Sequence, residues 1–182
     1  MAGKKNRSKG KKKGPAQNLA DLPSQMVYPH LHGRVVEALL PDVLDPEPWF
    51  VHEPGTRENR KETFIVGRFS CPNQSCRKAG WTTGKVCIHI TSYANSGYRA
   101  IVWSQRCKLC DTMGILALDE QSYIDRVAFR LKKWAGLVVP AVPYVKRGTP
   151  PHLSDFCEAC IAGFCERGVL SLSTSMNALR LG

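Results

Sequence analysis

Residues 71–110 of the chain read CPNQSCRKAGWTTGKVCIHITSYANSGYRAIVWSQRCKLC. The stretch begins with a C-x4-C pair and ends with a C-x2-C pair. The turn of such a pair points two sulfur atoms at one spot, where they occupy two corners of a tetrahedron around a metal ion. We therefore predict a zinc-ribbon-like β-hairpin whose ends are tied together by one ion, with four ligands: Cys71, Cys76, Cys107 and Cys110.

Three strands are expected around these two pairs. The first covers residues 62–69 and leads directly to Cys71. The second covers residues 81–91, in which branched apolar residues alternate with other types, and the third covers residues 98–105. A turn signal with Asn, Ser and Gly lies between the last two strands, at residues 93–97. The thirty residues between the two pairs are long for a ribbon hairpin, but they suit this arrangement.

An amphipathic helix is expected after the hairpin. Apolar residues recur at intervals of three and four from Tyr123 to Trp134, which places them on one side of a helix. Asp119 and Glu120 stand at its start, where negative charge suits the helix dipole, and Gly136 is a stop signal. We expect the apolar side to pack on the hairpin, which gives a small α+β fold.

A second set of ligands lies in residues 152–165, which read HLSDFCEACIAGFC. One histidine and three cysteines, His152, Cys157, Cys160 and Cys165, form a complete Cys3His set for a second zinc ion. The pairing of ligands between the two sites stays open. The C-x4-C pair can instead combine with the second C-x2-C pair, which leaves the first C-x2-C pair with the histidine and the last cysteine.

The spacing of the cysteines favours metal binding over disulfide or redox chemistry. Eight cysteines scattered at random would give roughly 0.3 pairs at the C-x2-C spacing, whereas the chain has two. No apolar signal segment follows the basic N-terminus, and no stretch is long enough to span a membrane. We therefore expect a reducing location, the cytoplasm or nucleus, where clustered cysteines are metal ligands. No thioredoxin-like pattern surrounds either pair.

The other histidines and the eighth cysteine are weaker candidates. Cys87 and His89 share one side of the second expected strand and are alternative ligands, although a buried free cysteine is the simpler interpretation. We interpret His30, His32 and His52 as packing or surface residues.

The charge of the chain is concentrated in its N-terminus. Net charge is +11, but residues 1–14 hold seven Lys or Arg and no acid, which leaves +4 for the rest. A nuclear signal, a nucleic-acid-binding arm and a solvated terminus all remain open for this tail. We divide the chain into a disordered basic tail (1–22), a short helix with a proline-rich linker (23–47), the zinc-binding domain (48–165) and a C-terminal tail (166–182).

The order of motifs resembles the 3CxxC-type zinc finger of fungal proteins, receptor-transporting proteins and zygote arrest proteins, over roughly residues 48–165. The matching positions are Phe69-x-Cys71, Cys76, Trp81, Gln105-x-Cys107-x-x-Cys110, Trp134 and His152-x4-Cys157-Glu-Ala-Cys160-x-x-Gly163-x-Cys165. The resemblance implies more than one zinc ion, with His152 beside a cysteine pair. The first pair departs from the pattern, because it is C-x4-C. The receptor-escort role does not transfer, because no C-terminal membrane anchor is visible.

These observations predict a structural zinc-binding protein with two zinc ions that mediates protein interaction. Closed four-ligand sites leave no open position for water or substrate, so we expect neither an enzyme nor a small-molecule substrate. RNA binding is the alternative, through the basic tail and four aromatic residues: Trp81, Tyr93, Tyr98 and Trp103. Because a small ribbon buries little apolar surface, Cys110→Ser or Cys160→Ser is expected to unfold the domain.

Overall fold

The computed structural model describes residues 22–42, 44–140 and 152–165. Its strands are β1 (Gln25–Val27), β2 (Trp49–Phe50), β3 (Arg57–Ser70), β4 (Gly80–Tyr93), β5 (Gly97–Trp103) and β6 (Ile115–Leu118). Its helices are α1 (His32–Glu37), α2 (Glu120–Trp134) and α3 (Glu158–Ile161), with the single turns η2 (Pro29–Leu31) and η3 (Ser154–Phe156). The predicted α+β class is confirmed. The basic tail, apart from Leu22, and the C-terminal tail lie outside the described residues.

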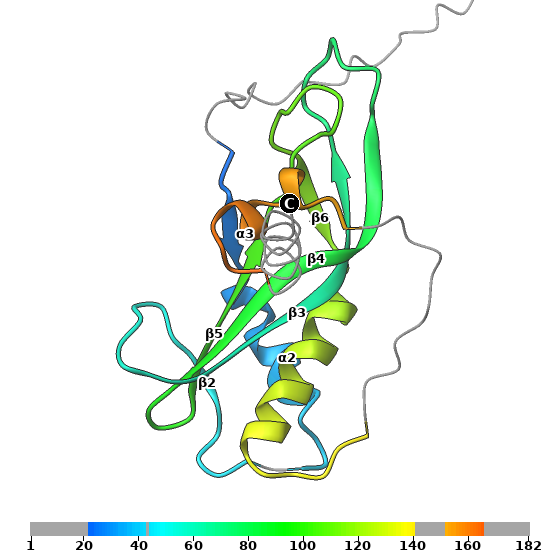
Figure 1. Ribbon diagram of the computed structural model, residues 1–182. Helices are drawn as coiled ribbons and strands as arrows, with labels where there is room; N and C mark the ends of the chain where they lie inside the picture. Colours follow the sequence, from blue (N-terminus) through cyan, green and yellow to red (C-terminus); the bar gives the residue numbers. More distant parts are fainter. Residues whose placement is uncertain (1–21, 43, 141–151, 166–182) are drawn as a thin grey trace, which may run out of the picture.

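One sheet organises the molecule, with the strand order β1-β5-β4-β3-β6 (Figure 1). All neighbours in this order are antiparallel, and β2 adds to β5 in parallel. The central pair is a long hairpin-like ladder that runs from Arg57 opposite Tyr93 to Ser70 opposite Gly80. β3 starts at Arg57, five residues earlier than predicted. Residues 57–61 are all polar and largely exposed, so they do not show the apolar alternation that indicates a strand. Their pairing with β4 rests on the main chain, so side-chain alternation gives no signal for it.

Both faces of the sheet are covered. Val86, Ile88 and Ile90 of β4 join the main core with α1 and α2. Cys87, which alternates with them along the strand, joins a second cluster with Trp103 and residues 157–165. Because successive side chains of a strand point to opposite faces, α2 and the second ligand segment lie on opposite sides of β4. All eight residues of β4 from Val86 onward are accordingly buried.

The start of α2 is fixed to β3 by a small polar network. The Asp119 side chain caps the helix by accepting a hydrogen bond from the Ser122 main-chain N–H at 3.0 Å. Ser122 Oγ in turn accepts one from the Val66 N–H at 3.0 Å, and the Asp119 N–H donates to the Val66 carbonyl at 3.2 Å. The five buried residues of α2 are Tyr123, Ile124, Val127, Ala128 and Leu131.

The N-terminal segment is part of the same fold. β1 pairs with β5, and Leu31, Val35 and Leu39 are buried in the main core. The sheet therefore begins before residue 48, within the segment 23–47 that the sequence suggested was a helix and linker. No helix of the described residues has the length and apolar character needed to cross a membrane.

Replacing each of two buried tyrosines by phenylalanine should change the stability of the protein in opposite directions. The hydroxyl of Tyr98 lies 3.1 Å from His32 Nδ1, whereas the hydroxyl of Tyr123 has no hydrogen-bond partner among the described residues. We expect Tyr98→Phe to lower the free energy of unfolding by about 1 kcal/mol. Tyr123→Phe should leave it unchanged or raise it, because an unpaired buried hydroxyl is costly. Thermal unfolding at one fixed zinc concentration compares them, and a larger loss for Tyr123→Phe would contradict this account.

Candidate metal centres

The first ligand pair is shaped by a turn that follows β3. The Ser75 N–H donates to Asn73 Oδ1 at 3.0 Å, and the Cys76 N–H donates to the Asn73 carbonyl at 3.0 Å. The Cys71 N–H donates to the Ala79 carbonyl at 3.1 Å, which closes the turn. The four intervening residues of the C-x4-C pair are thus folded back, so that both thiols lie on one side.

The second pair forms a tight loop between β5 and β6. The Cys110 and Asp111 N–H groups both point to the Cys107 carbonyl, at 3.3 and 2.8 Å. The Cys107 N–H donates to the Thr112 carbonyl at 2.9 Å. Asp111 takes a left-handed conformation, with φ of 55°, which reverses the chain. The loop thus folds back on the Cys107 carbonyl, which brings the thiols of Cys107 and Cys110 close together.

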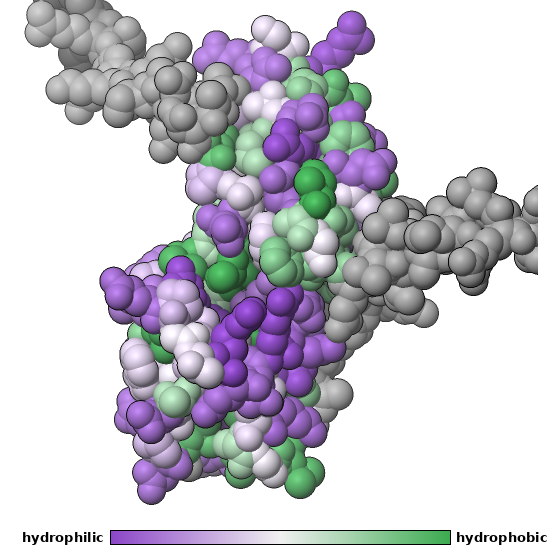
Figure 2. Space-filling model, turned by 60° about the vertical axis from the view of Figure 1, so that its left-hand side comes forward, coloured by the Kyte–Doolittle hydropathy of each residue, from purple (hydrophilic) through white to green (hydrophobic). Residues whose placement is uncertain are grey.

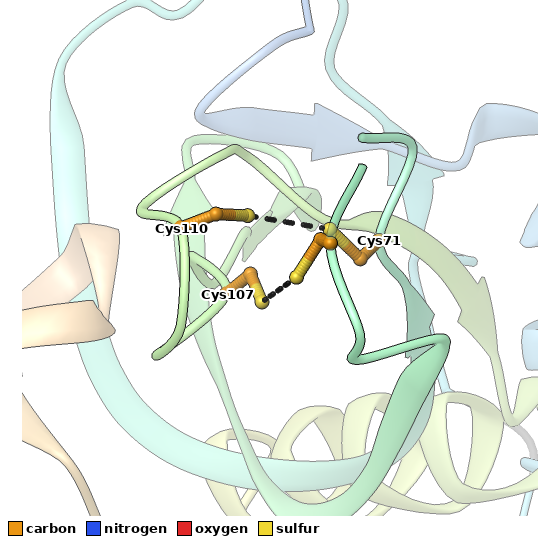
Figure 3. Close-up of side chains that lie close together, drawn as sticks. Cys71, Cys107 and Cys110 are labelled. Carbon is orange, nitrogen blue, oxygen red and sulfur yellow. Dashed lines mark hydrogen bonds between the residues drawn. The ribbon is translucent and has the colours of Figure 1, made fainter. Parts of the chain in front are cut away.

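The four thiols of these two pairs meet at one point. All four sulfur atoms lie within 4.8 Å of one another, and Figure 3 shows Cys71, Cys107 and Cys110 turned toward a common centre. Cys71 Sγ is 3.5 Å from Cys110 Sγ, and Cys76 Sγ is 3.7 Å from Cys107 Sγ. Zinc–sulfur bonds of about 2.3 Å in a tetrahedron require sulfur atoms about 3.8 Å apart. The group therefore fits one zinc ion, and could hold it.

The second group collects its four ligands from residues 152–165. His152, Cys157, Cys160 and Cys165 place their ligand atoms within 4.8 Å of one another. His152 Nε2 is 3.1 Å from Cys160 Sγ and 3.7 Å from Cys165 Sγ. A tetrahedral zinc site with one imidazole requires a nitrogen–sulfur distance of about 3.6 Å. This donor set also fits a zinc ion, and the alternative exchange of pairs between the sites does not occur in the structure.

The return of Cys165 depends on the turn after α3. Gly163 has a φ of 74°, a backbone conformation that residues with a side chain rarely adopt. Its N–H donates to the Cys160 carbonyl at 3.0 Å. The Phe164 N–H then donates to the Ala159 carbonyl at 2.7 Å. This reversal brings the last cysteine back beside the first three ligands.

Both centres share one short piece of chain, residues 104–107. Gln105 forms an antiparallel bridge with Cys157, and the Arg106 N–H donates to the Phe156 carbonyl at 2.8 Å. The Arg106 Nε also donates to Glu158 Oε1 at 2.5 Å. Cys107 of the first centre follows immediately. Sequence reasoning missed these linking residues, because the partners are about fifty positions apart and no pattern marks them.

Cys87 and His89 lie beside the second centre but outside both ligand groups. The Trp103 Nε1–H donates to His89 Nδ1 at 3.4 Å, so the proton of the neutral ring is on Nε2, which donates to the Phe164 carbonyl at 2.8 Å. Burial lowers the pKa of His89, in agreement with a neutral ring. Cys87 is 1% exposed and packs against Cys157 and Cys165. Among the described residues, the remaining histidines also lie outside the ligand groups.

The thiols of the metal-free protein differ in how readily they lose a proton. Burial raises the pKa of Cys71 to about 12 and that of Cys160 to about 11. The hydroxyl of Thr112, 3.3 Å from Cys110 Sγ, can donate to the thiolate and lowers the pKa of Cys110 to about 6. Since zinc binds the thiolate form, zinc binding must displace a proton from the thiols of Cys71 and Cys160.

Comparison with protein families gives the same result as the geometry. The family model of the 3CxxC zinc ribbon, described as a zinc-binding domain, matches residues 64–163, which is more than half of the chain. The chain belongs to this family. The matched part of this 3CxxC zinc ribbon contains seven of the eight residues in the two ligand groups, and Cys165 lies just beyond it. Neither the curated proteins nor the solved structures gave a match to the chain.

Loss of the second centre should be a local event. The main core holds seventeen buried residues, none of them from residues 152–165, so it is larger than a ribbon alone would provide. We therefore expect Cys160→Ser to lose one zinc ion and release residues 152–165, while α2 and the sheet stay folded. Native mass spectrometry gives the zinc count, and hydrogen exchange gives the protection of each segment.

The matched variant is Cys110→Ser, which should also lose one zinc ion but expose the loops at residues 71–80 and 104–114 instead. Two retained zinc ions in either variant would contradict the ligand assignment. Complete unfolding of both would show that the main core cannot stand without zinc, as the sequence alone suggests.

Zinc affinity should fall as the pH is lowered. Each proton displaced on binding weakens the apparent affinity by about tenfold per pH unit, and the raised pKa of Cys71 means that its thiol is protonated at neutral pH. Thr112→Val removes the hydrogen bond that favours the Cys110 thiolate, so it should steepen the dependence. Competition with a chromophoric chelator between about pH 6 and 8 measures both. An affinity that does not change with pH would contradict this expectation.

Proposed function

We propose that the chain is a non-enzymatic structural zinc protein, with the eight residues of the two groups as zinc ligands, and that it mediates protein interaction. Each group supplies four donor atoms, which occupy all four coordination positions of a tetrahedral zinc ion and leave none for a substrate or an activated water. The family to which the chain belongs is a zinc-binding one. The proposal places the protein in the cytoplasm or nucleus, where thiols stay reduced.

Exposed apolar side chains on the ligand segments support protein interaction. Nine large apolar residues of the described chain are exposed, and four of them lie within the loops that carry metal ligands. These are Leu109, Leu153, Ile161 and Phe164. Figure 2 shows apolar side chains gathered near the middle of the molecule, at the height of α3 in Figure 1. Exposed apolar residues that gather in one patch are typical of protein contact sites.

RNA binding has less support from the described residues. Three of the four aromatic residues that could stack on bases are buried, with exposures of 7% for Tyr93, 1% for Tyr98 and 6% for Trp103. Tyr98 belongs to the main core and Trp103 to the second cluster, which leaves Trp81 as a candidate. Single-strand binding needs several stacking positions along a basic groove. The basic tail lies outside the described residues, so this alternative rests on the sequence.

The test is a paired substitution on the full chain. Ile161 is 59% exposed on α3, and Val138 is 98% exposed outside the ligand loops. We expect Ile161→Asp to abolish capture of a bound protein that wild type retains from cells, while Val138→Asp keeps it, because only the first charge falls on the proposed contact surface. Zinc content, measured on both variants, should stay at two ions. Equal capture by both variants would contradict this use of the ligand loops.

A further inference from the structure

A pocket with a volume of about 120 Å³ lies between the two metal centres. It is bordered by residues next to ligands of the first centre and by a ligand of the second. The residues that matter for its chemistry are Lys78, Trp81, Lys108, His152, Leu153 and Phe156. Zinc binding at either centre fixes part of this wall, so the pocket belongs to the metal-loaded fold.

The apolar part of the pocket is held in place before any ligand arrives. The Trp81 ring stacks on Phe69 with centroids 5.2 Å apart and an angle of 15°. Its Nε1–H donates to Gln105 Oε1 at 3.1 Å, and a side chain at Gly114 would meet Trp81 Cη2 at 2.8 Å. Trp81 is therefore locked from three directions. Leu153, which is 48% exposed, and Phe156 complete the apolar lining.

The charged part of the pocket is positive and largely uncommitted. Arg106 lines it but is already paired with Glu158 at 2.5 Å and Asp111 at 3.4 Å. The ammonium groups of Lys78 and Lys108 have no ion-pair partner within the described parts of the chain. No acidic residue is among those that line the pocket. An occupant with negative charge is therefore favoured.

We propose that this pocket between the metal centres binds an acidic peptide segment of a partner protein. One apolar side chain of the peptide enters beside Trp81 and Phe156, and carboxylates that flank it pair with Lys78 and Lys108. The volume suits this occupant, since a cavity of about 150 Å³ holds one benzene ring. The proposal rests on the proposed function in protein interaction and adds the chemistry of the partner.

A nucleic acid fits the same surface less well. The pocket offers a single stacking ring, Trp81, whereas a strand requires a series of them. The described residues also carry fifteen Lys or Arg against thirteen Asp or Glu, so their charge is nearly balanced. A long electropositive track for a phosphate backbone would need a clear excess of basic residues.

The probe is a fluorescein-labelled pentapeptide, Asp-Asp-Leu-Asp-Asp, added to the zinc-loaded full chain and followed by fluorescence anisotropy. We expect binding that weakens with salt, and no binding of the peptides with Gly in place of Leu or Lys in place of Asp. Lys78→Glu and Lys108→Glu should each weaken binding by about tenfold, because attraction becomes repulsion. The matched control is Lys133→Glu on α2, which changes the net charge equally but lies outside the pocket lining.

Zinc content separates a pocket effect from a folding effect. Lys78 and Lys108 both lie in loops that carry ligands of the first centre, and the Lys78 main-chain N–H donates to Cys76 Sγ at 3.4 Å. Lys78→Gln keeps this main-chain contact and removes only the charge, so it serves as the milder variant, with an intermediate loss of binding expected at two zinc ions per chain. The proposal would be overturned if the peptide did not bind, or if Lys133→Glu weakened peptide binding as much as Lys78→Glu does. It would also be overturned if Lys78→Glu and Lys108→Glu changed only the affinity for zinc. Tighter binding of a decauridylate RNA that is lost in Lys78→Glu would overturn it too, in favour of a nucleic acid.

The same variants distinguish failure of the pocket from failure of the proposed function. A captured protein that is lost with Ile161→Asp but retained with Lys78→Glu would leave the protein-interaction function intact and show that the pocket is not its site. Loss with both variants, at full zinc content, is the result that we expect.

Discussion

The main-chain pairing of residues 104–106 with residues 156–158 of the second ligand segment is the contact that joins the two metal centres. Ser104 accepts a hydrogen bond from the Glu158 N–H at 3.2 Å, and Arg106 donates to Phe156, so the two ligand loops are joined as neighbouring strands are. Cys157 is part of this contact through its bridge with Gln105, and Cys107 is the next residue after it. An ion bound at one centre therefore limits the freedom of the chain that carries ligands for the other.

The second metal centre covers the face of the sheet that lacks a large hydrophobic core. One face of β4 is covered by α2 and a large apolar core, as in ordinary α+β folds, whereas its other face is covered by only fourteen described residues, 152–165. So short a segment buries too little apolar surface to stay in place unaided. Metal coordination, the His89–Phe164 hydrogen bond and the Arg106–Glu158 ion pair supply the missing stabilisation. Cys87 and His89 are buried for this reason, although neither belongs to a ligand group.

Sequence reasoning succeeded where the signal is local. The C-x2-C loops, the acidic start of α2 and the alternation along β4 each depend on residues a few positions apart, and the structure contains all three. It failed to predict β6, because its four residues are too short to show a period, and β1, which is recruited by β5 from far along the chain. The charged half of β3 was missed because a strand held by its main chain leaves no side-chain pattern.

The chemistry of the ligand loops explains why the exposed apolar residues gather there. A loop whose shape is fixed by an ion does not need its own side chains to form a core, so Leu109 and Ile161 are free to face outward. Exposed apolar groups on a flexible loop would collapse against the protein surface or lose entropy on binding. On a loop fixed by metal that entropy is already lost, and Trp81 is likewise held in place by its stacking on Phe69. The features that stabilise the fold thus also fix the shape of this surface.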